Sequence, residues 1–260
     1  MVESTLSREY LVKPSESDAN RQLPLTMLVA QLIDVATDHA NQLGIGFLKL
    51  EPLGRGWVLS RLSVEMRRWP LTGEAYVVKT WIESWNAHFS ERCFSFTTKS
   101  GETLGYARTI WMIIDLTTHQ SVGTGGEHVP AELIDGSACP IPGLRRHRPF
   151  TPQKVTEYVF KYCDLDFYRH VNTVRYISIL LNQFTLADFD THLLSRFDIA
   201  FAHEAKYGET AIIKSIEEEV ETPTLLAAES YRSFRRTFEM SLGSQPILSS
   251  AIVMSRALNE

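Results

Sequence analysis

The stretch of residues 162–177 gathers the side chains best suited to chemistry on a carbonyl group. It holds two acids, Asp164 and Asp166, a histidine, His170, and an asparagine, Asn172, just before an apolar helical pattern. The first turn of a helix offers unpaired backbone N–H groups and a partial positive charge, which stabilise an oxygen that becomes negative during a reaction. A neighbouring acid or imidazole can take a proton from water. The pattern therefore favours acyl-transfer chemistry, and the alternative is that these acids and Asn172 only cap the helix.

An internal repeat organises the elements around this stretch. The segments FSFTTKSGETLGYARTIWM, from Phe94, and FEMSLGSQPILSSAIVMSR, from Phe238, each predict a β-hairpin, because alternating apolar residues flank a Gly/Ser turn. A second pair, residues 62–74 and 197–209, predicts in both copies a strand, a break with Gly-Glu and a further strand. The two pairs have different offsets, which indicates that loop lengths differ between the halves.

Each half also has one long helical pattern ahead of its strands. Gly44 predicts the end of the first helix, and Asn172 is placed to cap the second. The helical positions are Leu28, Leu32, Val35, Ala36 and Leu43 in the first half, and Val174, Ile177, Leu181 and Phe184 in the second. His39, late in the first helix, is expected at the polar edge of that helix.

Each half therefore predicts one strand, one mostly buried helix and several antiparallel strands, which is an α+β architecture. We assign residues 1–122 to the first repeat and residues 151–260 to the second. The Gly- and Pro-rich segment 123–150 is the predicted linker.

Composition excludes several classes of function. The chain has 260 residues, of which 44 % are hydrophobic and 22 % charged, as in soluble globular proteins. A net charge of −5 argues against a nucleic-acid partner held by bulk positive charge. No apolar run reaches the roughly 18 residues that a membrane span needs. The eight histidines lack metal-ligand spacing, so we expect neither a metal nor a cofactor.

The cysteines and the N-terminal residues indicate the compartment. The three cysteines, Cys93, Cys139 and Cys163, are scattered along the chain, which favours a reducing environment. The N-terminal residues lack the apolar core of a signal peptide and resemble no transit segment. We therefore expect a cytoplasmic, bacterial protein rather than a plastid one.

One segment carries a family resemblance. DLDFYRHVNTVRYI resembles the DxDxNxHVNNxxY motif of the acyl-acyl-carrier-protein (acyl-ACP) thioesterases, plant and bacterial enzymes that end fatty-acid synthesis by hydrolysis. RRWPLTGEAYVVKTWIESW is similar to that family's stretch in the first half, so the resemblance covers most of the chain. It implies two tandem hotdog repeats, each a long helix wrapped by an antiparallel β-sheet. It also implies that the first repeat holds the acyl chain and the second performs the chemistry.

The resemblance assigns roles by position. Asp166 and His170 match the acidic residue and the histidine of the family's active site, and Tyr168 stands where the family has an asparagine. FAHEAKYGE is similar to a later family element, which places its glutamate at Glu204 and puts Ala205 in place of its cysteine. A covalent cysteine mechanism is therefore excluded at this position, whereas attack by water remains.

The implied mechanism is general-base hydrolysis of a thioester. Glu204, with His170 nearby, activates a water, and Asp166 orients His170 or a neighbouring amide. The carbonyl oxygen points at backbone N–H groups near Asn172. The leaving thiol has a pKa of about 8.5 and needs little help from a general acid. Tyr168 either replaces the asparagine as a hydrogen-bond donor or is a packing residue that has weakened catalysis.

The implied partner is an acidic acyl carrier protein that bears a fatty acyl chain. A basic face to receive it would consist of Arg145, Arg146, Arg148, Lys161, Arg169 and Arg175. Three alternatives stay open: an acyl-CoA thioesterase of the same fold, a hotdog dehydratase, and an acyl-binding protein without activity. Two fused repeats are compatible with a monomer and with a homodimer.

Overall fold

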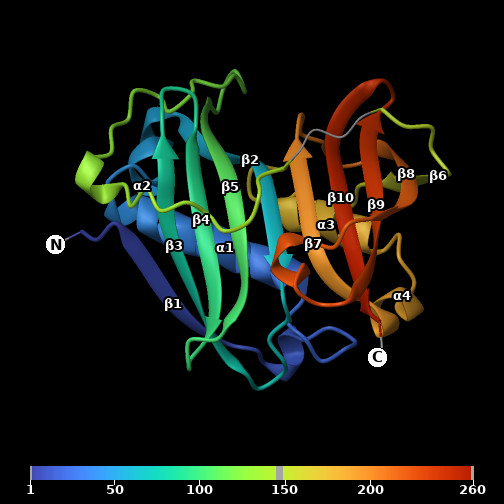
Figure 1. Cartoon of the computed structure of the whole chain (residues 1–260). Coiled ribbons are helices and arrows are strands. Elements are labelled where there is room, and N and C mark those ends of the chain that lie inside the picture. The colour runs from blue at the N-terminus through green and yellow to red at the C-terminus, as the bar shows by residue number, and fades with distance from the viewer. Residues whose placement is uncertain (1, 145–148, 259–260) are drawn as a thin grey trace.

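The computed structural model describes residues 2–144 and 149–258, and its strands form one antiparallel sheet of ten (Figure 1). The first half contributes β1 (Thr5–Leu11), β2 (Arg55–Met66), β3 (Ala75–Trp85), β4 (Ser90–Thr98) and β5 (Thr103–Asp115). The second half contributes β6 (Lys154–Val159), β7 (Leu193–Phe201), β8 (Thr210–Val220), β9 (Tyr231–Leu242) and β10 (Gln245–Ala257).

The strand order confirms the internal repeat. It runs β1-β3-β4-β5-β2-β7-β10-β9-β8-β6, so both halves follow one pattern when counted from their outer edges to the centre. The paired positions also match in burial: Phe94 and Phe238 are fully buried, and so are Leu104 and Leu248. The predicted α+β architecture of two hotdog repeats is confirmed.

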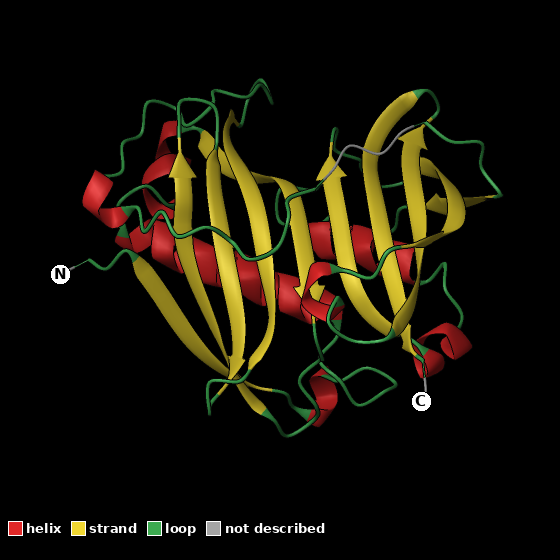
Figure 2. Cartoon of the chain, in the orientation of Figure 1, coloured by secondary structure: helices red, strands yellow, loops and turns green. Residues whose placement is uncertain are grey.

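The two long helices lie on one face of the sheet, as Figure 2 shows. The helices are α1 (Leu25–Gln42), α2 (Phe47–Leu50), α3 (Thr173–Leu181) and α4 (Leu186–Thr191). The predicted core positions Leu28, Leu32 and Val35 of α1 are buried, and Gly44, with φ 72°, follows the end of the helix. Because α1 and α3 also contact each other, they form a continuous apolar layer under the sheet.

The second helix begins as predicted. The Asn172 side-chain oxygen accepts a hydrogen bond from the Val174 N–H at 2.9 Å, which satisfies one of the free donors of the first turn. Phe184 lies beyond the end of α3, and its ring packs 6.1 Å from that of Phe238 in β9.

His39 is buried, so its predicted place at a polar helix edge is wrong. Its side chain is closed off by β4 and by the segment before β1. Arg92 donates to Nδ1 at 2.8 Å, so the ring proton resides on Nε2, which donates to the Glu3 carbonyl at 3.1 Å. Burial, and secondarily the Arg92 charge, lowers the pKa of His39 to about 4.

The two repeats join through β2 and β7, which pair with Ser63 opposite Asp198. Ser63 donates to Asp198 at 2.6 Å, and Arg196 pairs with Asp198 at 2.7 Å and also with Glu65. These groups are buried or nearly so, and the two carboxylates pair with the same guanidinium. The junction is therefore both a backbone ladder and a buried ion-pair network.

The segment after β5 crosses the sheet on the face opposite the helices (Figure 1). Cys139 and Ile141 pack there against Trp81 and Cys93, and the Trp81 indole N–H donates to the Ser137 carbonyl at 2.7 Å. The bounds 123–150 for a linker stay a prediction. Among residues 2–144 and 149–258, no helix combines the length and apolar character that crossing a bilayer requires.

Candidate active site

The residues from Asp166 to His170 form a tight turn ahead of α3. The Asp166 Oδ1 accepts the backbone N–H groups of Tyr168 at 2.9 Å and His170 at 3.1 Å. The Asp166 N–H donates to the His170 carbonyl at 2.8 Å, and Arg169 adopts φ 66° to close the turn. Asp166 therefore fixes the backbone that carries the imidazole, and its hydrogen bonds among the described residues go to backbone groups, not to the ring.

The first repeat contains the same turn, which the sequence analysis missed. The Asp18 Oδ1 accepts the N–H groups of Asn20 and Gln22, both at 2.9 Å, and Arg21 adopts φ 58°. The Asp18 N–H donates to the Gln22 carbonyl, also at 2.9 Å. The likeness of DANRQ to DFYRH is the signal that could have revealed it. In the first repeat, Gln22 takes the place of the histidine.

The loop after β7 brings the carboxylate to the histidine. Val171 donates to the Ala205 carbonyl at 2.9 Å, and His170 forms a bridge with Lys206. This pairing places the Glu204 Oε2 3.4 Å from the His170 Nε2. The Glu204 side chain is 42 % exposed, so its carboxylate is open to solvent.

The first repeat has no such carboxylate. Gln22 forms the equivalent bridge with Leu71, and the residue two positions before Leu71 is Trp69. Trp69 is buried and donates its indole N–H to the Leu194 carbonyl at 3.0 Å. The two repeats share this backbone frame, but the frame carries a histidine and a glutamate only in the second repeat.

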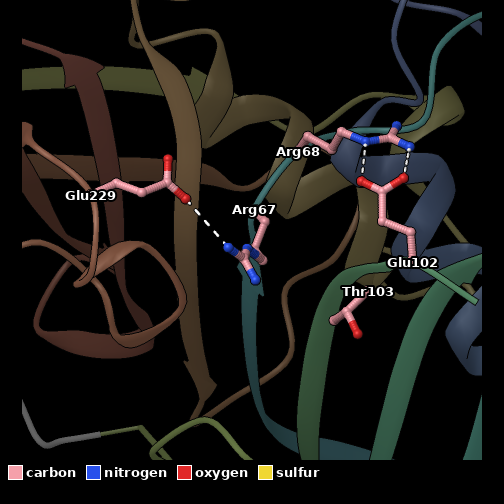
Figure 3. Close-up of a pocket in the computed structure, with 5 residues that line it drawn as sticks. All are labelled: Arg67, Arg68, Glu102, Thr103 and Glu229. Carbon is pink, nitrogen blue, oxygen red and sulfur yellow. Dashed lines mark hydrogen bonds and ion pairs between the residues drawn. The ribbon is translucent and has the colours of Figure 1, made fainter.

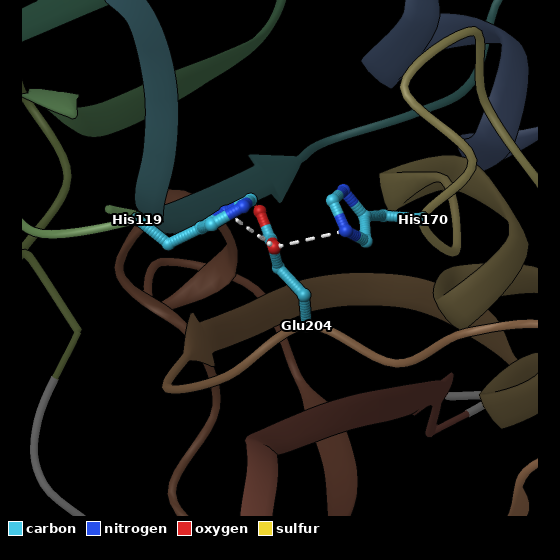
Figure 4. A group of neighbouring side chains, drawn as sticks. All are labelled: His119, His170 and Glu204. Carbon is cyan, nitrogen blue, oxygen red and sulfur yellow. Dashed lines mark ion pairs between the residues drawn. The ribbon is translucent and has the colours of Figure 1, made fainter. Parts of the chain in front are cut away.

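A third side chain, His119, completes the cluster and was not predicted. Its Nδ1 lies 3.2 Å from the Glu204 Oε2, and its ring meets that of His170 edge to face at 5.4 Å. Figure 4 shows the Glu204 carboxylate between the two imidazoles. His119 comes from the turn after β5 of the first repeat, so no sequence spacing relates it to the motif.

The backbone of this turn is unusual. Asp115 accepts the N–H groups of Thr117 at 2.9 Å and Thr118 at 2.8 Å, and the His119 N–H donates to the Asp115 carbonyl at 2.9 Å. His119 itself adopts φ 56°, a left-handed conformation that costs energy for residues other than glycine. The turn thus holds the imidazole in place through its backbone.

The start of α3 offers one free backbone donor. The N–H groups of His170, Val171, Asn172 and Val174 all have acceptors within the turn, the loop or the cap. Within the described part of the chain, the Thr173 N–H has no acceptor. Several backbone amides near Asn172 were predicted to bind the carbonyl oxygen. Of these, only the Thr173 N–H is free among the described residues, and the side-chain amide of Asn172 can donate beside it.

Tyr168 and Asp164, two other candidate residues of the motif, contact groups outside the His170–Glu204 cluster. The Tyr168 ring packs 4.2 Å from that of Phe167, and burial, followed by the Glu51 and Asp166 carboxylates, raises its pKa. Asp164 is buried and accepts the Tyr158 hydroxyl at 3.0 Å and the Lys161 N–H at 2.7 Å, which is a structural role.

Ala205, at the position of the family's cysteine, is fully buried. Its N–H donates to the Tyr176 hydroxyl at 3.1 Å. The neighbouring His203 points away from the cluster, because its Nδ1 contacts the Pro246 carbonyl at 2.7 Å.

Two surface cavities differ in their relation to this cluster. One of about 690 Å³ adjoins the Asp166 turn and is lined by Tyr162, Cys163, Leu165, Asp166, Arg169, Lys206 and Tyr207. The other, of about 430 Å³, lies between the repeats near Arg67 and Arg68 (Figure 3). There Arg68 pairs with Glu102 at 2.9 Å and Arg67 with Glu229 at 3.4 Å, so the arginine charges are already neutralised. The first cavity borders the turn that carries His170, whereas the second is removed from that turn.

The cluster also has the donor atoms of a metal site. One ligand atom from each of His119, His170 and Glu204 lies within 4.8 Å of the other two. The sequence predicted no metal, because these residues are far apart along the chain.

Comparison with known proteins places this geometry in a family. The model of the acyl-ACP thioesterase N-terminal domain matches residues 3–129, and that of the C-terminal domain matches residues 148–242. The chain belongs to the acyl-ACP thioesterase family. The resemblance carried by the helix-start motif is thereby confirmed.

Solved structures of other acyl-ACP thioesterases have the same fold as this chain. A crystal structure described as an acyl-ACP thioesterase from Bacteroides thetaiotaomicron is 28 % identical, covers 96 % of this chain and 98 % of that one, and has a TM-score of 0.81. The 12:0-ACP thioesterase from Umbellularia californica is 18 % identical, covers 98 % of this chain and 95 % of its own, and has a TM-score of 0.77.

A curated plant relative is a much longer protein than this chain. The chloroplastic palmitoyl-acyl carrier protein thioesterase of Gossypium hirsutum is 24 % identical over 225 residues, which are 81 % of this chain and 54 % of that protein. The chain spans about half the length of the curated relatives it matches.

Proposed function

We propose that the protein hydrolyses the thioester of a fatty acyl chain carried by acyl carrier protein and releases the free fatty acid. The observation that carries this proposal is the pairing of the Glu204 Oε2 with the His170 Nε2 at 3.4 Å, in a family of acyl-ACP thioesterases. The carboxylate is open to solvent and can therefore reach a water molecule.

In the mechanism we propose, Glu204 acts as the general base. It takes a proton from water while the water oxygen bonds to the thioester carbonyl carbon. His170 holds the carboxylate and the water in line, and Asp166 holds the backbone of His170. The carbon–sulfur bond then breaks, and the proton passes from Glu204 to the leaving sulfur. A thiol with a pKa of about 8.5 is a good leaving group, so no strong general acid is needed.

The carbonyl oxygen becomes negative when water attacks, and we place it at the start of α3. The free Thr173 N–H and the Asn172 side-chain amide are the donors we assign to it, supported by the partial positive charge of the helix N-terminus. The Tyr168 hydroxyl has no hydrogen-bond partner among the described residues, so it remains free to replace the family's asparagine.

We infer that the carrier protein approaches over the cavity beside Asp166. Arg169 and Lys206 line this cavity, and Lys161 and Arg175 are also exposed nearby. These cations form a local basic face on a chain of net charge −5, which suits an acidic partner. Arg145, Arg146 and Arg148 of the predicted basic cluster lie outside the described residues.

An assay of free thiol release from acyl-ACP and acyl-CoA, over a series of chain lengths, tests the proposal. We expect turnover of acyl-ACP, and we expect Glu204→Gln to lower kcat by at least about 100-fold. Turnover of acyl-CoA alone would favour the coenzyme A alternative, and double-bond formation would favour a dehydratase. Acyl binding without turnover would leave an acyl-binding protein and refute the proposal.

The carrier surface has its own test. Reversal of charge at Arg169 and Arg175 to Glu should raise KM for acyl-ACP and spare small thioesters. An equal effect on both substrates would contradict the assigned surface.

We also place the protein in the cytoplasm, because Cys163 is an exposed free thiol, as expected in a reducing compartment. Oligomeric state is best measured by light scattering, which separates the monomer from the homodimer.

A further inference from the structure

We propose that His119, His170 and Glu204 form a binding site for a divalent transition-metal cation of the zinc class, and that the bound cation blocks hydrolysis. The binding site stands on the geometry of the three side chains alone. The block rests on the proposed function, because it assumes that Glu204 is the base.

The donor set is the first reason. Two imidazole nitrogens and one carboxylate oxygen are a ligand combination that zinc accepts in open, three-residue sites, with a fourth position left for solvent. In this cluster, one ligand atom from each residue lies within 4.8 Å of the others. Softer and harder cations are less suited, since the set has no thiolate and only one carboxylate.

The distances between the ligand atoms are the second reason to propose a zinc site. Zinc–nitrogen and zinc–oxygen bonds of about 2.0–2.1 Å in a tetrahedron place neighbouring ligand atoms about 3.3 Å apart. The Glu204 Oε2 lies 3.2 Å from the His119 Nδ1 and 3.4 Å from the His170 Nε2. A charge-assisted hydrogen bond is shorter, at about 2.7–2.9 Å. The contacts therefore have the spacing of two ligand pairs around one ion.

The backbone is the third reason. Asp166 holds the turn that carries His170, and Asp115 holds the turn that carries His119. Among the described residues other than glycine, positive φ occurs at Arg21, Arg169 and His119. The first two close the equivalent turns of the two repeats, so His119 is strained outside that shared frame. Both imidazoles are thus presented on constrained backbone, which lowers the entropy cost of binding an ion.

Access and charge are also suitable. The side chains of His119 and Glu204 are 47 % and 42 % exposed, while that of His170 is 16 % exposed, so an ion can enter from solvent. Within the described part of the chain, the ion pairs of Glu204 are with these two histidines, and no lysine or arginine competes for it.

The bound cation would occupy the atoms that hydrolysis needs. The Glu204 Oε2 lone pair and the His170 Nε2 would both be coordinated, so Oε2 could no longer take a proton from water and the whole carboxylate would be a weaker base. Since His119 lies in the first repeat and the other two residues in the second, the ion would also link the repeats.

Calorimetric titration of the untagged, chelator-treated full chain with Zn²⁺, without substrate, tests the site. We expect one saturable site per chain, weakened at least about 10-fold in His119→Ala and in Glu204→Gln. His203→Ala is the matched control, because His203 neighbours Glu204 but contacts the Pro246 carbonyl, and it should bind Zn²⁺ as the unchanged chain does. No saturable binding, or equally tight binding by His119→Ala, would overturn the proposal.

A second arm measures thioester hydrolysis with and without Zn²⁺. We expect activity to fall as the site fills and to return after addition of a chelator, in the unchanged chain and in His203→Ala. Stoichiometric binding with unchanged or increased activity would refute the block while leaving the site and the proposed function intact. If the chain hydrolyses no thioester at all, the proposed function fails, and calorimetry still decides whether the site exists.

Discussion

The Nδ1 of His119 lies 3.2 Å from the Oε2 of Glu204, although the two residues belong to different repeats. The turn after β5 reaches the loop after β7 because β2 and β7 pair side by side and draw the two halves into one sheet. The candidate site is therefore a property of the joined repeats. An isolated second repeat would contain His170 and Glu204 but lack one of the two imidazoles that flank the carboxylate.

Replacement of His119 by alanine should weaken hydrolysis. The Glu204 carboxylate would lose one of the two imidazoles that flank it, so the base would be held less firmly in line with the water, and kcat/KM should fall about 10-fold or more. Steady-state kinetics in metal-free buffer measure the effect, with His203→Ala as the control. Equal activity of the two variants would show that His119 does not position the base.

The repeated turn provides a matched pair of variants. Asp166→Ala and Asp18→Ala each remove two hydrogen bonds to backbone N–H groups, so each should lower the free energy of unfolding by about 1–2 kcal/mol. Only Asp166→Ala displaces the imidazole, so only it should lower kcat, by about 10-fold or more. Denaturant titration and thioester assays separate the two effects. A similar loss of kcat in Asp18→Ala would contradict a role specific to the second repeat.

The buried network between the repeats should dominate stability. Arg196→Met leaves the carboxylates of Glu65 and Asp198 without their cation, and such a loss costs about 3–5 kcal/mol. The exposed pair of Arg235 with Glu218 gives the comparison, since Arg235→Met should cost at most about 1 kcal/mol. Urea denaturation of both variants measures the difference. Equal midpoints would mean that the junction is held by the backbone ladder alone.

His39 should make stability depend on pH. Its folded-state pKa of about 4 lies below the value of about 6.5 expected in the unfolded chain, so the unfolded state binds the proton first as pH falls. Stability from the neutral ring is therefore complete above about pH 6.5 and is lost as the pH falls towards 4. This group alone should remove about 2 kcal/mol between about pH 7.5 and pH 5.

The variant His39→Gln isolates this contribution. Glutamine keeps an acceptor for Arg92 and a donor for the Glu3 carbonyl, but it does not titrate. The unfolding free energy of His39→Gln should therefore change less over the same pH range than that of the unchanged chain. Parallel pH profiles would contradict the buried neutral histidine.

The sequence determined the elements that depend on neighbouring residues. The alternation around Phe94 and Phe238, the helical spacing of Leu28 and Leu32, and the cap at Asn172 are all short-range patterns, and they predicted the repeat, the helices and the start of α3. The motif resemblance also put His170 and Glu204 forward as a pair. Such features can be recognised in the sequence because helix hydrogen bonds and the spacing of buried residues involve positions only a few residues apart.

Tertiary structure alone decided which distant residues meet. His119 joins the site, and His39 is enclosed beside Arg92, because strands from separate parts of the chain pair in one sheet and close over particular side chains. Neither residue has a local pattern that marks its surroundings, since a turn histidine and a helix histidine look alike in the sequence wherever they are packed. Their roles follow from long-range packing, in which contacts depend on the whole fold and not on spacing along the chain.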